Sequence, residues 1–246
     1  MKTKIIYEDR DILVIHKPPG LATQTAKVGQ QDVVSELKNY LSAKFPGGQI
    51  KREPYLGIIH RLDQPVGGLL AFAKNKNAAA ALTAQLRGEK ESGTGTLNKF
   101  YYGVFCGNSS GGSGELIDDL YKDSSGKAMI WEGSGGEKPP QVKRAVLQYR
   151  IQQAVQVQSI VLSLAQIHIT TGRYHQIRAQ MSHAGMSLLG DAKYADASSR
   201  VISEKLNIRN VALCAYNLEF YHPITKEKMS FQIKPQEEVF SYFSIK

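Results

Sequence analysis

Strand-like segments follow one another in the second half of the chain, with no helical pattern between them. Residues 145–152 alternate between apolar and mostly polar side chains, and residues 160–169 (IVLSLAQIHI) continue as a second strand. Residues 99–105 (KFYYGVF) form an aromatic-rich strand candidate before them. A doubly wound parallel sheet would need helices between its strands. The sequence therefore predicts an α+β fold with a mixed, mainly antiparallel central sheet, flanked by helices and loops.

Two helices are expected before this strand-rich part. Residues 30–48 (QQDVVSELKNYLSAKFPGG) carry apolar side chains at helical spacing, with Asp32 as N-cap. Residues 77–87 (NAAAALTAQLR) are alanine-rich, and Gly88 is placed to end that helix. Glycine- and serine-rich stretches further on read as surface loops, because strand-like segments resume on either side. Residues 1–246 are therefore predicted to form a single domain.

The charge balance bears on the partner. The net charge is +9 and the pI is about 9.4, with the basic residues spread along the chain. Such a field attracts polyanions, which makes nucleic acid the first partner to consider. A merely soluble basic protein is the other reading of the same charge.

The N-terminal segment, the hydropathy and the cysteine spacing argue against a secreted, membrane-spanning, disulfide-bonded or thiolate-metal protein. Charges recur every few residues near the N-terminus, unlike a signal peptide, and no apolar run is long enough to span a membrane. Cys106 and Cys214 are far apart, which argues against a disulfide framework and a thiolate metal site. A cytoplasmic location is expected.

Residues 57–74 (GIIHRLDQPVGGLLAFAK) place His60, Arg61 and Asp63 between two short apolar runs. Pro65 disfavours helix just before it, so Asp63 is expected on an irregular turn. Gly67 and Gly68 allow the backbone to approach another chain segment or a ligand closely. The carboxylate can be a nucleophile, a general base or a member of a structural ion pair. A protein-kinase reading fails, because the order is His-Arg-Leu-Asp and the other kinase motifs are missing.

A second group of polar residues occupies residues 170–181 (TTGRYHQIRAQM), after a strand. A helix beginning near Gly172 would present free backbone N–H groups that suit a phosphate. On that helix His175 and Arg178 would share a face, with Arg173 near its start. The alternative is that these side chains only cap and solvate the helix.

No metal site is predicted. His168, His175 and His183 are seven and eight residues apart and match no zinc-binding pattern. Asp191 follows a glycine and is assigned to a structural turn.

Taken together, these segments resemble the RluA-type RNA pseudouridine synthases. The stretch HRLDQPVGGLLAFAK is similar to that family's catalytic motif, and TTGRYHQIRAQMSHAGMSLLGDAKYA to its arginine motif. Three further segments match in the family's order: YEDRDILVIHKPPGL, NKFYYGVFCG and NVALCAYNLEFYHPITKEKMSF. The resemblance covers most of the chain.

The resemblance implies a pseudouridine synthase fold with a central RNA-binding cleft, and an isomerase that moves uracil's link to ribose from N1 to C5. It makes Asp63 the catalytic carboxylate, Tyr101 the active-site tyrosine and Arg178 the partner of Asp63. It implies a monomer that needs no cofactor or metal. The residues expected to contact RNA are His60, Arg61, Arg173, His175 and Gln176.

The sequence also departs from the family's usual pattern. Val66-Gly67-Gly68 replaces the commoner Thr-Ser-Gly, Tyr174 stands where a small or basic residue is usual, and Gln180 and Cys214 replace frequent histidines. The chain begins close to its first family-like strand, so no N-terminal S4 domain is expected. RNA would then bind a basic surface on the catalytic domain, with these candidates: Lys51, Arg52, Lys138, Lys143 and Arg144.

Which RNA is modified stays open between transfer RNA and ribosomal RNA. Two other functions compete with the isomerase. A non-catalytic RNA-binding or chaperone protein could retain the same fold. A hydrolytic glycosidase would need a second carboxylate facing Asp63, for which Asp191 is the only candidate.

Overall fold

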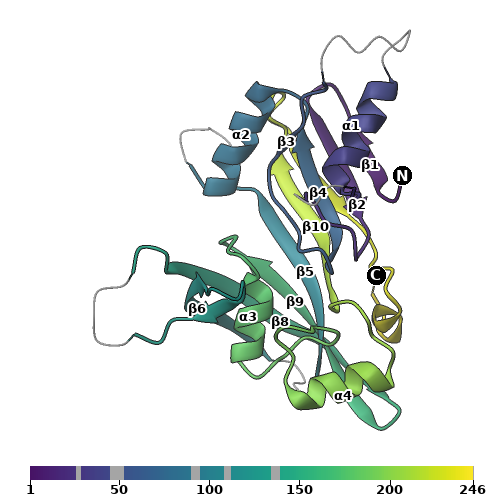
Figure 1. Ribbon diagram of the computed structural model, residues 1–246, viewed down its shortest axis with the longest axis vertical. Coiled ribbons are helices and arrows are strands. Elements are labelled where there is room, and N and C mark those ends of the chain that lie inside the picture. Colours follow the sequence, from purple (N-terminus) through teal and green to yellow (C-terminus); the bar gives the residue numbers. More distant parts are fainter. Residues whose placement is uncertain (26–28, 45–52, 90–94, 108–111, 134–138, 246) are drawn as a thin grey trace. The chain divides into compact units, whose positions relative to one another are not determined.

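The computed structural model describes residues 1–25, 29–44, 53–89, 95–107, 112–133 and 139–245 (Figure 1). The chain falls into two compact units. Unit 1 comprises Met1–Asn98 and Ala215–Ile233, and unit 2 comprises Lys99–Cys214 and Lys234–Lys246. Among the described residues, no helix combines the length and apolar character needed to cross a bilayer.

Unit 1 is built on a sheet in which β1, β2, β4 and β10 are neighbours in that order, with β3 on β4 and β11 on β10. Its strands are β1 (Lys4–Glu8), β2 (Ile12–Lys17), β3 (Gly57–Ile58), β4 (Gly67–Ala73), β10 (Leu213–Tyr221) and β11 (Lys228–Gln232). The pairings β1–β2, β2–β4, β3–β4 and β10–β11 are antiparallel, and an isolated parallel bridge joins Ala22 to Asp32. The two short apolar runs on either side of His60, Arg61 and Asp63 thus contribute to β3 and β4.

Two helices complete unit 1, as the sequence predicts. Helix α1 (Val33–Ala43) is capped by Asp32, whose side chain accepts a hydrogen bond from Ser35 N. Helix α2 (Lys76–Arg87) ends at Gly88, which adopts the left-handed conformation at φ 70°. Ala78 and Leu82 of α2 pack in one core with Ile12, Leu69 and other buried residues of the sheet.

Unit 2 contains a second run of strands in the order β5, β9, β8, β6, β7. They are β5 (Asn98–Cys106), β6 (Ser113–Lys122), β7 (Ala128–Ile130), β8 (Lys143–Val157) and β9 (Ile160–Ile169). Pairings β5–β9, β8–β9, β6–β8 and β6–β7 are all antiparallel. Together with the helices this confirms the predicted α+β fold and its mainly antiparallel strands.

The helices of unit 2 are α3 (Gln176–His183) and α4 (Ala197–Lys205), and a 3-10 helix, η2 (Glu238–Tyr242), follows near the chain end. Helix α3 packs on the strands β6, β7 and β8 through Ala179, which lies in one core with Leu120, Ala128 and Ala145 (Figure 1). Cys106 and Cys214 are both free thiols, as expected from their spacing.

The predicted start of α3 near Gly172 is wrong. The helix begins at Gln176, and His175 precedes it in the left-handed conformation at φ 51°. The cause is the side chain of Gln176, whose Oε1 accepts hydrogen bonds from Thr171 Oγ1 (2.8 Å) and Arg173 N (3.0 Å). These bonds hold residues 171–173 in a turn, so His175 and Arg178 do not share a helical face.

Gly68 shows why glycine follows the Asp63 segment. Its φ is +131°, and a Cβ there would lie 2.5 Å from both N and O of Ala215 on β10. The close approach expected for this glycine is therefore made to the protein's own backbone. Gly20 also has a positive φ, +84°, but no atom lies within 4 Å of its would-be Cβ.

We predict that Gly68→Ala lowers the free energy of unfolding by about 3 kcal/mol or more, because backbone strain adds to a clash with backbone atoms. The control Gly20→Ala carries only the strain and should lose about 1–2 kcal/mol. Urea unfolding followed by circular dichroism measures both. Equal midpoint shifts for the two variants would contradict the packing argument.

Candidate functional site

Asp63 lies on a turn in unit 1 between β3 and β4. Its carbonyl accepts a hydrogen bond from Val66 N at 3.0 Å, and residues 64–65 form the turn. The residue is half-buried, whereas Arg61 is exposed and Leu62 between them is buried. This confirms the predicted turn and leaves the carboxylate of Asp63 partly accessible.

A buried lysine, Lys17, fixes this turn through hydrogen bonds to backbone carbonyl groups. Lys17, at the end of β2, has no exposed surface. Its ammonium donates to the carbonyl oxygens of Leu21 (2.6 Å), Pro18 (3.0 Å) and Gln64 (3.2 Å). Charged donors make stronger hydrogen bonds than neutral ones. Lys17 therefore holds the turn beside Asp63 against the segment that follows β2.

Other contacts fix the remaining loop residues. Thr23 Oγ1 donates to Leu62 O at 2.9 Å and accepts from Leu62 N at 3.3 Å. His60, 9% exposed, accepts a hydrogen bond from Ala71 N of β4 at its Nε2. His60 is thus a positioning residue of the loop, and its predicted RNA contact stays a prediction.

Arg178 is held by a buried carboxylate in unit 2. Its Nε donates to Asp191 Oδ2 and its Nη2 to Asp191 Oδ1, each at 2.7 Å. Arg178 is 4% exposed and Asp191 is 2% exposed. The bidentate geometry fixes the guanidinium in orientation as well as in charge. This pair involves Nε and Nη2, and an arginine carries five N–H donors in all.

Asp191 cannot serve as the second carboxylate of a glycosidase. Besides Arg178, its Oδ1 accepts hydrogen bonds from Lys193 N at 3.0 Å and Tyr194 N at 3.2 Å. Both oxygens of this buried carboxylate are therefore engaged in hydrogen bonds, which gives Asp191 a structural task. The assignment of Asp191 to a structural turn is confirmed, and its pairing with Arg178 is an addition that the sequence did not indicate.

The ring of Tyr194 makes a cation–π contact with Arg178, whose guanidinium carbon lies 5.0 Å from the ring centroid. The hydroxyl of Tyr194 accepts from Ala128 N at 2.7 Å and lies 2.9 Å from Nδ1 of His175. Burial raises the pKa of Tyr194 to about 12, so the phenol stays protonated and can donate to His175. His175, 9% exposed, also stacks on Tyr174 at 3.8 Å between ring centroids.

Gln176 and Arg173 complete the turn before α3. Gln176 is 3% exposed and its Nε2 donates to Val146 O at 3.0 Å. Arg173 is exposed, and its Nε donates to Arg144 O at 2.9 Å. Gln176 therefore positions the turn, while Arg173 presents charge to solvent. RNA contact by either residue stays a prediction.

Tyr101 and Lys99 lie on the same face of β5, since side chains two residues apart in a strand point the same way. Tyr101 is 5% exposed and Lys99 is 6% exposed. Burial lowers the pKa of Lys99 to about 8, and burial is the only cause of that lowering. A lysine buried in this way is an uncommon feature that the sequence did not reveal.

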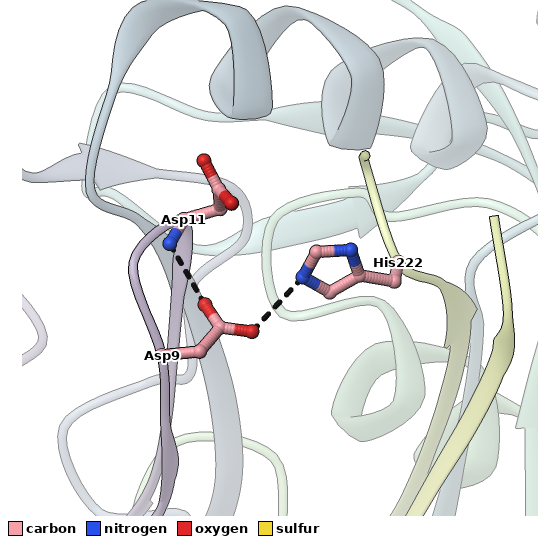
Figure 2. A group of neighbouring side chains, drawn as sticks. All are labelled: Asp9, Asp11 and His222. Carbon is pink, nitrogen blue, oxygen red and sulfur yellow. Dashed lines mark hydrogen bonds and ion pairs between the residues drawn. The ribbon is translucent and has the colours of Figure 1, made fainter. Parts of the chain in front are cut away.

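One cluster of possible metal ligands occurs among the described residues: Asp9, Asp11 and His222 in unit 1 (Figure 2). Its donor atoms are already engaged. His222 Nδ1 accepts from Ile224 N and Thr225 N, and its Nε2 lies 2.9 Å from Asp9 Oδ2. The other oxygen of Asp9 accepts from Asp11 N and Ile12 N. These contacts explain the cluster as a structural tie between the β1–β2 turn and the segment after β10.

The predicted site residues thus form two sets. His60, Arg61 and Asp63 belong to one loop of unit 1, and unit 2 contributes Tyr101, Arg173, His175, Gln176 and Arg178. Of the basic candidates, Lys143 and Arg144 are exposed, whereas Lys51, Arg52 and Lys138 lie outside the described residues. The sequence did not identify Lys17, Lys99 or Tyr194 as positioning residues. Only Lys17 had a recognisable signal, because this lysine ends an apolar strand directly before Pro18-Pro19.

Comparisons with known proteins agree with these motifs. A family model described as RNA pseudouridylate synthase matches residues 11–183. An uncharacterized RNA pseudouridine synthase of Aquifex aeolicus is 31% identical, over 98% of this chain and 72% of the relative. Ribosomal large subunit pseudouridine synthase D of Zymomonas mobilis is 31% identical, over 95% and 70%. Dual-specificity RNA pseudouridine synthase RluA of Vibrio vulnificus is 30% identical, over 98% and 89%.

Solved structures share the fold. Human RNA Pseudouridylate Synthase Domain Containing 1 superposes with a TM-score of 0.70 at 22% identity, covering 98% of this chain and 86% of that one. The human Domain Containing 4 protein gives 0.68 at 22% identity, covering 97% and 90%.

Removing the charge of Asp191 should destabilise the protein. We predict that Asp191→Asn lowers the free energy of unfolding by about 3–5 kcal/mol, because the buried guanidinium of Arg178 would lose the charged carboxylate that binds it in a bidentate pair. The control is Glu53→Gln: Glu53 pairs with Lys38 at 2.7 Å, but its side chain is 72% exposed. That change should cost less than about 1 kcal/mol. Similar urea midpoints for Asp191→Asn and the wild type would contradict the assignment.

Removing the charge of Lys99 should have the opposite effect. An ordinary pKa of 10.5 lowered to about 8 corresponds to a cost of about 3 kcal/mol for the charged form. The unfolded chain binds more protons between these values, so the cost is complete below about pH 8 and disappears above about pH 10.5. We predict that Lys99→Met raises the free energy of unfolding near neutral pH and that this gain shrinks with rising pH.

Urea midpoints at a series of pH values measure this gain, with Lys205→Met, a change at an exposed lysine, as the control. A gain that stays constant from neutral pH to about pH 10.5 would show that it comes from apolar packing instead of the buried charge.

Proposed function

Because the chain belongs to the RNA pseudouridylate synthase family, we propose that Asp63 is the catalytic carboxylate of this RNA-modifying isomerase. The observation that supports this role is the half-buried Asp63, on a turn that the buried ammonium of Lys17 fixes through three carbonyl oxygens. Catalytic groups gain from such rigid support, because a displaced group loses its reactive geometry.

The reaction conserves every atom of the nucleotide. The N1–C1′ bond of uridine breaks, the uracil turns, and a C5–C1′ bond forms while C5 loses a proton and N1 gains one. We propose that an ionised Asp63 acts on the ribose, either by attack at C1′ or by removal of the C2′ proton. Both routes need the charged carboxylate, which a neighbouring guanidinium favours.

Arg178 and Tyr101 have complementary parts in this proposal. Asp191 fixes the orientation of the Arg178 guanidinium through Nε and Nη2, and we propose that the same guanidinium also binds the carboxylate of Asp63. The buried ring of Tyr101 offers a flat surface on which the detached uracil can stack. We propose that the two units act as one catalytic domain, with a central RNA-binding cleft in which all three residues reach the same uridine.

RNA is the substrate, and its class is part of the proposal. Two relatives carry the names ribosomal large subunit pseudouridine synthase D and dual-specificity RNA pseudouridine synthase RluA. We infer ribosomal or transfer RNA in which the target uridine leaves its stack, at a cost of about a few kcal/mol. Arg61, Arg173 and Arg144 are exposed cations that can contact its phosphates. We further propose a cytoplasmic monomer that uses no metal.

We predict that wild-type protein releases tritium from RNA transcripts labelled with 5-tritiated uridine, and that Asp63→Asn lowers the rate by at least about a thousandfold. Transcripts of large-subunit ribosomal RNA and pooled transfer RNA serve as substrates. The variant should keep the wild-type circular dichroism and urea midpoint. Glu132→Gln, which removes an exposed acid, should keep full activity.

Full activity of Asp63→Asn would refute the catalytic assignment. The competing RNA-binding or chaperone function would be favoured by a different result: tight, salt-sensitive RNA binding by the wild type, with no tritium released from any transcript. Mapping pseudouridines in total RNA from a strain that lacks the gene would identify the modified position.

A further inference from the structure

Among the described residues, Lys99 differs from Lys17, the other deeply buried lysine. Lys17 has no exposed surface and its ammonium binds three carbonyl oxygens, as expected for a structural cation. Lys99 is 6% exposed, and within the described part of the chain its ammonium makes no hydrogen bond and no ion pair. A buried charge without a partner destabilises a fold. Methionine would fill the same space without that cost, so stability does not explain this lysine.

The ammonium of Lys99 faces the turn before α3. A Cβ on Gly172 would lie 3.4 Å from Lys99 Nζ, so the backbone of the turn passes close to the charge. Gln176 fixes this turn by accepting hydrogen bonds from Thr171 Oγ1 and Arg173 N. Because Gly172 has no side chain and is exposed, an anion that reaches this turn can approach the ammonium of Lys99 closely.

Lys99 is also placed correctly with respect to Tyr101. The two side chains leave the same face of β5 two residues apart, a spacing of about 7 Å along the strand. In a nucleotide whose uracil stacks on Tyr101, the distance from the base to its own phosphates is comparable with this spacing. The partner that Lys99 lacks in the protein is thus available from the substrate.

We propose that Lys99 and the turn at Gly172 form a subsite for one phosphate of the RNA strand, next to the nucleotide that contacts Tyr101. This inference rests on the proposed function for its choice of RNA as the anion. In this subsite the phosphate is the negatively charged partner of the Lys99 ammonium. The same contact holds the ribose-phosphate end of the nucleotide while its base is detached.

Two variants test the subsite in complementary ways. Lys99→Met removes the charge, and Gly172→Ala keeps it but adds a methyl group 3.4 Å from Nζ, at a backbone position without positive φ. The probe is fluorescein-labelled oligouridylate, titrated by anisotropy at several salt concentrations. Lys99→Met should weaken binding by about fivefold to tenfold and reduce the slope of log K against log salt by about 0.7. Gly172→Ala should weaken binding similarly, and Lys205→Met should change neither quantity.

A direct titration separates a phosphate contact from a merely structural role. The ¹³Cε resonance of Lys99 should titrate near 8 in the free protein and at a higher pH with saturating oligouridylate, since a bound phosphate favours the charged ammonium. With tritium-labelled transcripts, Lys99→Met should raise KM more than it lowers kcat. Wild-type affinity, salt slope and KM in Lys99→Met, with an unmoved Lys99 resonance, would overturn the subsite.

The two proposals fail in different ways. If the wild type releases tritium but Lys99→Met binds and reacts like the wild type, only the phosphate subsite is wrong. If no transcript releases tritium but oligouridylate still moves the Lys99 titration and depends on Gly172, the subsite stands and the catalytic proposal is wrong.

Discussion

The buried ion pair between Arg178 and Asp191 anchors helix α3 of unit 2. Helix α3 is only eight residues long, so its own backbone bonds give it little stability. The guanidinium of Arg178 on this helix is fixed by the carboxylate of Asp191. That carboxylate accepts hydrogen bonds from the backbone N–H groups of Lys193 and Tyr194. The pair therefore ties the loop after α3 to the helix. It also fixes the orientation of a buried guanidinium.

The two buried lysines show how one residue type serves two purposes. Lys17 is satisfied by carbonyl oxygens and converts the segment after β2 into a rigid support for the turn that carries Asp63. Lys99 is left with its desolvation cost, which appears as its lowered pKa. A protein retains such a cost where the charge has a task that a stable apolar residue cannot perform. Lys17 is thus a structural cation, whereas we propose that Lys99 is a binding cation.

The sequence predicted what depends on neighbouring residues and missed what depends on distant ones. The caps of α1 and α2 at Asp32 and Gly88 were correct, because capping is decided within a few residues. The start of α3 was wrong because the side chain of Gln176, not the Thr-Thr-Gly pattern, decides where the turn ends. The partner of Arg178 within unit 2 lies thirteen residues away at Asp191, a pairing that periodicity does not encode. The three catalytic assignments themselves came from family resemblance and remain predictions.

The chemistry of an isomerase gives these positioning contacts a common purpose. A hydrolase can release its leaving group, and it would need a second available carboxylate, a role that the engaged oxygens of Asp191 rule out for that residue. An isomerase must instead retain the detached base and present its other edge to the same carbon. Once the N1–C1′ bond is broken, the base and the sugar are no longer linked, so each has to be held separately. In our proposal Tyr101 offers the base a flat surface, and Lys99 on the same strand offers a positive charge to the phosphate attached to the sugar. Since one strand carries both side chains, the distance between the two anchors is fixed by the backbone and does not change while the base turns.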